Sequence, residues 1–306
     1  MSDSWFDDIP VLGNRTTPEV EEYLRSVGDD ETADAVSAVS ATRGAMFSAD
    51  WSLFGRVPAW KHTTHSYGFI PLTGGGAELL PLRHAGNIDP DLSLRNSRIR
   101  ITLDRLRVAE YPGRGVHRVL VDFSAQHAVP HGVEQLHFNA TYRVLEGEQA
   151  AVTGYPVFVG LAVASEGVAF RCYTVNVQND DDEAFLGFLE SNVFRSGLRL
   201  AVSAQPAIAP LSEMAYSITR SVAKRNRNVP VQEFYLGLDF SRTAAGARLA
   251  EGSYVVVQLP ESLGAIWDWR EWVYDPQRGT IVEAANPSRT IPYNYIVFSV
   301  TRHTDE

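Results

Sequence analysis

The sequence has a single cysteine, Cys172, among its 306 residues, and it has no long apolar run. One cysteine excludes an internal disulfide and a metal site made of several thiolates. The longest apolar runs, such as Tyr155–Val159, are far shorter than the roughly 20 residues that cross a bilayer. The first residues show neither the basic nor the apolar stretch of a signal peptide. We therefore expect a soluble, cytoplasmic protein without a transmembrane segment.

The sequence also lacks the motifs of nucleophilic catalysis and of phosphate binding. The chain contains no Gly-x-Ser-x-Gly sequence, and Gly74–Gly76 lacks the lysine of a phosphate-binding loop. Cys172 alternates in phase with Val168 and Phe170, which directs its side chain towards the core, where a thiol is usually inert. These absences favour a binding protein over an enzyme.

The negative charge is concentrated at the N-terminus. Residues 1–50 hold 11 acidic and 3 basic side chains, whereas the rest of the chain holds 26 acidic and 24 basic ones. We interpret residues 1–50 as an acidic arm, helical or partly disordered, and residues 51–306 as the main domain, with 51–96 as an irregular lead-in. The net charge of −10 and the small basic set argue against nucleic acid as a partner.

Two helices are predicted within the arm. Thr16-Thr-Pro-Glu19 combines a hydroxyl cap, an early proline and a capping-box glutamate, and Gly28 marks the end of this helix. The alanine-rich stretch Asp30–Arg43 is the second predicted helix.

Beyond Asn96 the apolar residues follow the period of two that is typical of strands. Ile99, Ile101 and Leu103 share one face and the phase then slips, which predicts a bulge near Asp104. Seven further strands are predicted, at residues 155–163, 168–177, 198–202, 233–240, 252–259, 280–282 and 293–302. Helices at 182–194 and 211–225 are too few for a βαβ alternation. The sequence therefore predicts a mainly β fold: a two-sheet antiparallel β-sandwich with two short covering helices, preceded by the small helical and irregular N-terminal segment.

Residues 119–123 and 136–144 are predicted to pair as a hairpin. Phe123 then lies opposite Phe138, so that both apolar faces coincide. The same register places Asp122 opposite Asn139 on the outer face of the hairpin.

An aromatic segment near the C-terminus is the strongest candidate for a contact surface. It holds three of the six tryptophans, and two tyrosines follow it: Trp267, Trp269, Trp272, Tyr293 and Tyr295. These rings either form a stacking platform or protein-binding surface, or close a hydrophobic corner of the fold with Arg270 and Glu271 turned outward.

Histidines and one glutamate gather around the predicted hairpin turn. His127, His131, Glu134 and His137 have the ligand types that suit zinc, iron or manganese, although no standard ligand spacing is present. The register aligns His127 with Glu134 and His137 with Ser124. The alternative interpretation is a solvated hairpin tip.

An acidic loop follows the strand at 168–177. Asp180, Asp181 and Asp182 offer the clustered oxygens that calcium prefers. The alternative is a set of carboxylates that stabilises a helix N-terminus through the free N–H groups.

The leading hypothesis is a non-enzymatic binding or interaction module whose partner is another protein. It would act through the aromatic segment or the acidic loop, and the N-terminal arm would regulate access. Two alternatives require a divalent cation: a metal-dependent hydrolase using His127–His137, and a calcium-dependent membrane- or glycan-binding module. The basic residues that end the second covering helix are Arg220, Lys224, Arg225 and Arg227. Cations at a helix C-terminus need no partner, because the helix dipole stabilises them. The alternative is contact with a phosphate, an acidic peptide or the acidic arm of the same chain.

Overall fold

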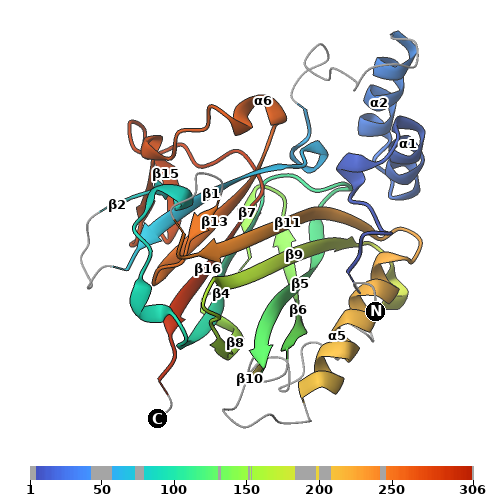
Figure 1. The fold of residues 1–306 in the computed structure, drawn as a ribbon. Coiled ribbons are helices and arrows are strands. Elements are labelled where there is room, and N and C mark those ends of the chain that lie inside the picture. The colour runs from blue at the N-terminus through green and yellow to red at the C-terminus, as the bar shows by residue number, and fades with distance from the viewer. Residues whose placement is uncertain are drawn as a thin grey trace.

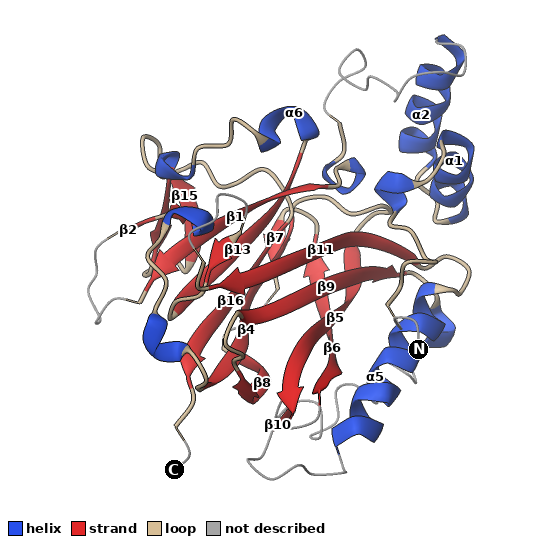
Figure 2. Cartoon of the chain, viewed as in Figure 1, coloured by secondary structure: helices blue, strands red, loops and turns tan. Residues whose placement is uncertain are grey.

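The structure is a computed structural model that describes residues 5–42, 57–72, 79–129, 132–150, 152, 154–182, 198–199, 208–241 and 246–304. Its described strands form three sheets, and helices lie at the N-terminus, along one sheet face and in the C-terminal third (Figures 1 and 2). The mainly β class is therefore confirmed.

The largest sheet has eight strands. In spatial order these are β10 (Leu198–Arg199), β8 (Tyr155–Ala162), β4 (Arg98–Val108), β16 (Tyr295–Arg302), β13 (Gly252–Leu259), β1 (Thr64–Pro71) and β3 (Arg83–His84), with β7 (Glu148–Gln149) beside β4. The five-stranded sheet consists of β12 (Ala247–Arg248), β11 (Val229–Asp239), β9 (Gly167–Val177), β5 (Val116–Val129) and β6 (Gly132–Leu145). The three-stranded sheet consists of β15 (Thr280–Glu283), β14 (Trp272–Asp275) and β2 (Leu80–Pro81).

The predicted architecture, a sandwich of two antiparallel sheets, is therefore only partly correct. A third sheet is present, and β10 pairs with β8, and β12 with β11, in parallel. The lead-in at 51–96 contains β1, which pairs with β13 along its full length.

The main core lies between the eight-stranded and five-stranded sheets. Phe298 of β16 lies 6.2 Å from Phe123 of β5 and 6.1 Å from Phe170 of β9, measured between ring centroids. Cys172 is fully buried in the same cluster, as its phase predicts, and burial raises the pKa of its thiol. Apolar contact across the two facing sheets is the main source of stability for such a layered fold.

The predicted details of β4, β5 and β6 are confirmed. The pairing of β4 with β16 shifts between Leu103 and Arg105, so that Asp104 is the extra residue of a bulge. In the β5–β6 hairpin Phe123 pairs with Phe138, as the alternation requires.

The two helices of the arm are also present, as α1 (Thr17–Ser26) and α2 (Asp30–Thr42). The backbone N–H of Thr16 donates to the carboxylate of Glu19 at 2.8 Å, which completes the predicted capping box. Gly28 follows α1 with a φ of +76°, a conformation that glycine adopts without steric cost.

The outer face of the five-stranded sheet is covered, contrary to the expectation for the hairpin. Helix α5 (Ile208–Ala223) packs along β6, β9 and β5, and the N-terminal residues lie next to it (Figure 1). Asp122 and Asn139 are fully buried beneath this cover. The alternation identified the face correctly, but it carries no information on what packs against that face.

The described residues contain no helix with both the length and the apolar character that a bilayer span requires.

Candidate functional site

The predicted aromatic surface is largely interior. Trp269 and Trp272 are buried between the outer face of the eight-stranded sheet and the three-stranded sheet, in a second apolar cluster. The indole N–H of Trp269 donates to the Ser66 hydroxyl at 2.9 Å. Tyr295 is fully buried in the same cluster. These rings close a hydrophobic corner of the fold.

Two members of the aromatic segment keep a partly accessible surface. Trp267 stacks on Trp272 with ring centroids 5.4 Å apart, and Tyr293 lies edge-on to Trp267. Arg270 and Glu271 are exposed, as a corner of this kind predicts. Of the five predicted aromatic side chains, only Trp267 and Tyr293 are therefore partly accessible.

Of the predicted metal ligands of the hairpin, the structure describes only the side chain of His137. His131 and the side chains of His127 and Glu134 lie outside the described residues, and the backbones of the latter two pair as predicted. His137 does not belong to a solvated tip, because its ring is buried under the N-terminal residues. Its Nδ1 lies 3.0 Å from the carboxylate of Asp122.

The acidic loop forms a short 3-10 turn, Asp180–Asp182. Asp182 is buried, with its carboxylate 2.5 Å from Arg225 and accepting a hydrogen bond of 2.6 Å from the Asn228 side chain. Asp181 is exposed. Asp182 thus joins this loop to the end of α5. Within the described residues no group of three or more acidic, histidine or cysteine side chains is arranged to hold a metal ion.

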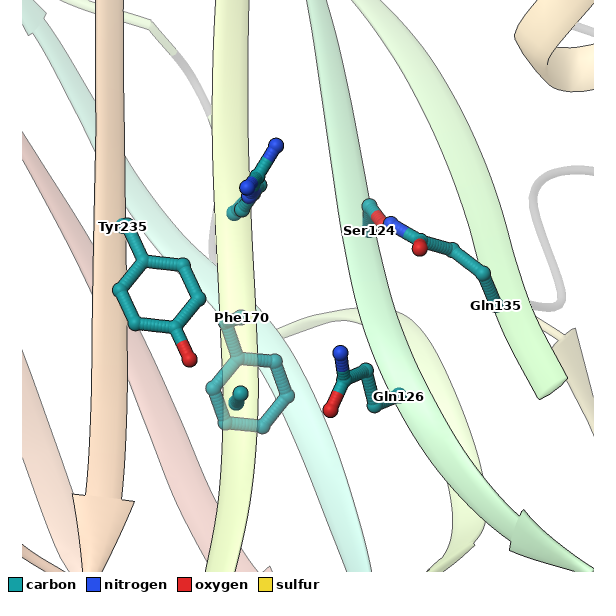
Figure 3. Close-up of a pocket in the computed structure, with 7 residues that line it drawn as sticks. Ser124, Gln126, Gln135, Phe170 and Tyr235 are labelled. Atoms are coloured by element: carbon teal, nitrogen blue, oxygen red, sulfur yellow. The ribbon is translucent and has the colours of Figure 1, made fainter. Parts of the chain in front are cut away.

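An open pocket lies on the outer face of the five-stranded sheet, beyond the end of the cover formed by α5. It encloses about 250 Å³, and its walls come from β5, β6, β9 and β11 (Figure 3). The residues that line it are Ser124, Gln126, Gln135, Ala169, Phe170, Arg171 and Tyr235. The described residues of this lining include no carboxylate, whereas hydrogen-bond donors are abundant.

Arg171 is the cation of this pocket. Its guanidinium lies 5.2 Å from the ring of Trp5 and 5.7 Å from the ring of Tyr235. Such contacts hold the guanidinium in place without neutralising its charge. The closest carboxylate among the described residues is that of Asp7, at 3.8 Å on an exposed side chain. Arg171 is therefore fixed in position and remains available to an anionic group.

The first described residues pack against this site. We call residues 5–9 the N-terminal strap. Phe6 is fully buried and stacks on Tyr173 and Tyr216, while the indole N–H of Trp5 donates to Glu233 at 2.8 Å. Trp5 in turn supports Arg171, so the strap forms one side of the candidate site.

Asp8 of the arm binds the basic end of α5, which is one of the alternatives that the charge pattern left open. Asp8 accepts hydrogen bonds from Arg220 at 2.9 and 2.5 Å and from Lys224 at 3.1 Å. These bonds lower the pKa of Asp8, Arg220 having the largest effect. The basic cluster thus contacts its own chain.

Sequence reasoning missed Arg171, Tyr235 and Gln126. Their signal was present, because Arg171 alternates with the core residues Phe170 and Cys172 and so must face outward. Their convergence depends on the pairing of β9 with β5 and β11, which includes a register shift near Pro230. The register between these strands cannot be predicted from the alternation of apolar and polar residues within one strand, because the strands are far apart in the sequence.

Comparison with family models, with curated proteins and with solved structures found no match for this chain. The function of the protein is therefore inferred from the geometry of the site.

Proposed function

We propose that this protein is a non-enzymatic binding module that captures an acidic segment of another protein on the outer face of its five-stranded sheet. The open pocket beside Arg171 carries this proposal. It joins a cation held by two aromatic rings to a lining without carboxylates.

The chemistry of the lining favours a carboxylate as the bound group. Arg171 offers a guanidinium, and Gln126 and Ser124 add an amide and a hydroxyl. Hydrogen bonds from a guanidinium to a carboxylate are charge-assisted and stronger than neutral ones. The approach of Asp7 to Arg171 within the same chain is consistent with this preference.

The pocket is too small to hold a large ligand by itself. A volume of about 250 Å³ accommodates a group the size of one or two side chains, and larger ligand pockets reach several times that volume. Tyr235, which is 56% exposed at its rim, provides a flat apolar surface for the residues next to the captured carboxylate. A small polar pocket bordered by an exposed tyrosine resembles the energetic centre of a protein–protein interface.

The proposal is tested by binding of short peptides that differ only in charge. Fluorescence polarisation would compare acidic peptides with matched versions in which Asp and Glu are replaced by Asn and Gln. We expect the acidic peptides to bind about tenfold more tightly, because the neutral versions lose charge-assisted hydrogen bonds. Gln126→Ala and Tyr235→Ala should each weaken binding, whereas Leu92→Ala, at another exposed apolar residue, should not. Equal affinity for acidic and neutral peptides would contradict the proposal.

The cation-dependent alternatives stay predictions. A metal-dependent hydrolase would use His127, His131 and Glu134, and a calcium-dependent module would use Asp180 and Asp181. Elemental analysis after mild purification, together with melting curves in calcium, zinc and EDTA, tests both, because a metal bound to the folded state raises the melting temperature.

A further inference from the structure

The N-terminal strap lies in a groove between α5 and the five-stranded sheet, and it is held there by side chains. Tyr173 donates its hydroxyl hydrogen to the carbonyl of Ile9 at 2.7 Å, and Trp5 bonds to Glu233. Within the described part of the chain, no backbone–backbone hydrogen bond joins residues 5–9 to the sheet. The strap is thus bound in the manner of a peptide ligand, with the groove supplying the contacts.

The contacts define a recognition pattern. Two adjacent aromatic side chains, Trp5 and Phe6, enter the groove, and a carboxylate two residues later meets Arg220 and Lys224. Tyr173 bonds to the backbone of Ile9, whose side chain is also buried in the core. The strap therefore presents an aromatic–aromatic–x–acidic–apolar pattern to the groove.

The surface beneath the strap is mainly aromatic, but it contains one polar atom that the strap leaves unsatisfied. His137 lies under the rings of Trp5 and Phe6, and its Nε2 has no hydrogen-bond partner among the described residues. A buried polar atom without a partner raises the free energy of the closed state, and water satisfies that atom when the cover leaves.

The outward side of the strap is open. Asp7 and Asp8 are exposed, and residues 8–10 border a groove of about 710 Å³ whose other walls come from α1 and the turn after α5. Open space therefore lies next to the end of the strap at residues 8–10, whereas Trp5 and Phe6 are buried.

From these observations we infer that the groove is a second recognition site, at present occupied by the chain's own strap, and that a partner protein displaces the strap with a segment of the same pattern. The inference extends the proposed binding function, but it does not depend on the Arg171 pocket, since Gln126 and Tyr235 do not line the groove.

The test uses the full-length protein and a fluorescent peptide of residues 5–12. In the wild type the tethered strap competes at an effective concentration on the order of millimolar and suppresses binding. Asp8→Lys reverses the charge that meets Arg220 and Lys224, so the strap is held less tightly and the peptide should bind about tenfold more tightly.

Asp34→Lys is the matched control, because it makes the same charge change on an exposed side chain that pairs with Arg25 instead. We expect it to bind the peptide as the wild type does. Equal affinity of the Asp8→Lys and wild-type proteins would overturn the inference, and so would formation of a dimer by strap exchange between two copies.

A second measurement follows the strap of the wild-type protein directly. In wild-type protein labelled with fluorotryptophan, the ¹⁹F signal of Trp5, assigned with Trp5→Phe, should move to a solvent-exposed position as unlabelled peptide is added. A Trp5 signal that does not change at millimolar peptide would show that the groove stays closed. Trp5 and Asp7 of the strap contact Arg171, so the groove and the pocket adjoin. Gln126→Ala and Tyr235→Ala alter residues that line the pocket, and they should leave binding of the strap peptide unchanged. These two variants make failure of the strap inference and failure of the proposed function distinguishable.

Discussion

Asp122 connects three buried side chains on the outer face of the five-stranded sheet. It accepts a hydrogen bond from Thr219 at 2.9 Å and lies 3.0 Å from Nδ1 of His137. Asn139 completes the group and also donates to the carbonyl of Ala215 in α5 at 2.8 Å. A buried network of this kind stabilises the fold only while every member keeps its partners.

Asp122→Ala should therefore destabilise the protein strongly. It removes the acceptor of the Thr219 hydroxyl and leaves His137 and Asn139 partly unsatisfied, which we expect to lower the free energy of unfolding by about 3–5 kcal/mol. Urea unfolding monitored by circular dichroism measures this change. Asp34→Ala, at an exposed ion pair, should lower it by less than about 1 kcal/mol. A similar small effect of Asp122→Ala would show that the network does not contribute to stability.

At the scale of elements, β1 illustrates how one side chain determines the composition of a strand. A Cβ atom at Gly68 would lie 2.6 Å from the ring of Trp269, so this ring occupies the space that a side chain would fill. The face of β1 that contacts Trp269 consequently carries the small residues Ser66 and Gly68 instead of large apolar side chains. The three-stranded sheet packs on β1 and β13 through this contact.

Gly68→Ala should displace Trp269 and loosen the contact between β1 and the three-stranded sheet. We expect a loss of about 1–3 kcal/mol of unfolding free energy, because added volume forces strained side chains in a packed interior. Gly237→Ala is the matched control, since it lies in β11 and a Cβ there would meet only Tyr235, at 3.8 Å. Thermal unfolding of both variants measures the difference. A Gly68→Ala protein as stable as Gly237→Ala would mean that Trp269 moves without cost.

At the scale of the whole molecule, the stability of the protein at low pH depends on histidines that pack within the fold. Burial lowers the pKa of His65 to about 4, and Nε2 of this ring has no hydrogen-bond partner in the described part of the chain. Burial also lowers the pKa of His117, which packs against Tyr111 between the sheets. Both rings are therefore neutral in the folded protein at pH 7.

The free energy of unfolding should be highest above pH 6.5 and should fall as the pH drops from 6.5 to 4. Over this range the unfolded chain binds a proton on His65 that the folded protein does not bind. The shift corresponds to a loss on the order of 3 kcal/mol for this one residue. Urea unfolding at pH 7 and pH 4.5 measures it, and His65→Gln should reduce the difference between the two pH values. An unchanged difference in His65→Gln would contradict this assignment.

Local patterns predicted much of the fold. The period of two along residues 99–108 and 116–145 predicted the bulge at Asp104 and the pairing of Phe123 with Phe138, because both depend on neighbouring residues in one or two adjacent strands. The capping box at Thr16 and Glu19 is equally local. The charge pattern suggested contact between the arm and the basic end of α5 as one alternative, and Asp8 makes this contact with Arg220.

The sequence by itself determined which residues face inward, where α1 begins and that the fold is mainly β, since steric alternation and capping act within a few residues. The tertiary structure decided what covers each face. It buried Asp122 and His137 under the strap and α5, enclosed Trp269 and Trp272 between two sheets, and brought Arg171 to Tyr235. These contacts join residues far apart in the chain, and their formation depends on the packing of whole sheets and helices, which no local pattern encodes.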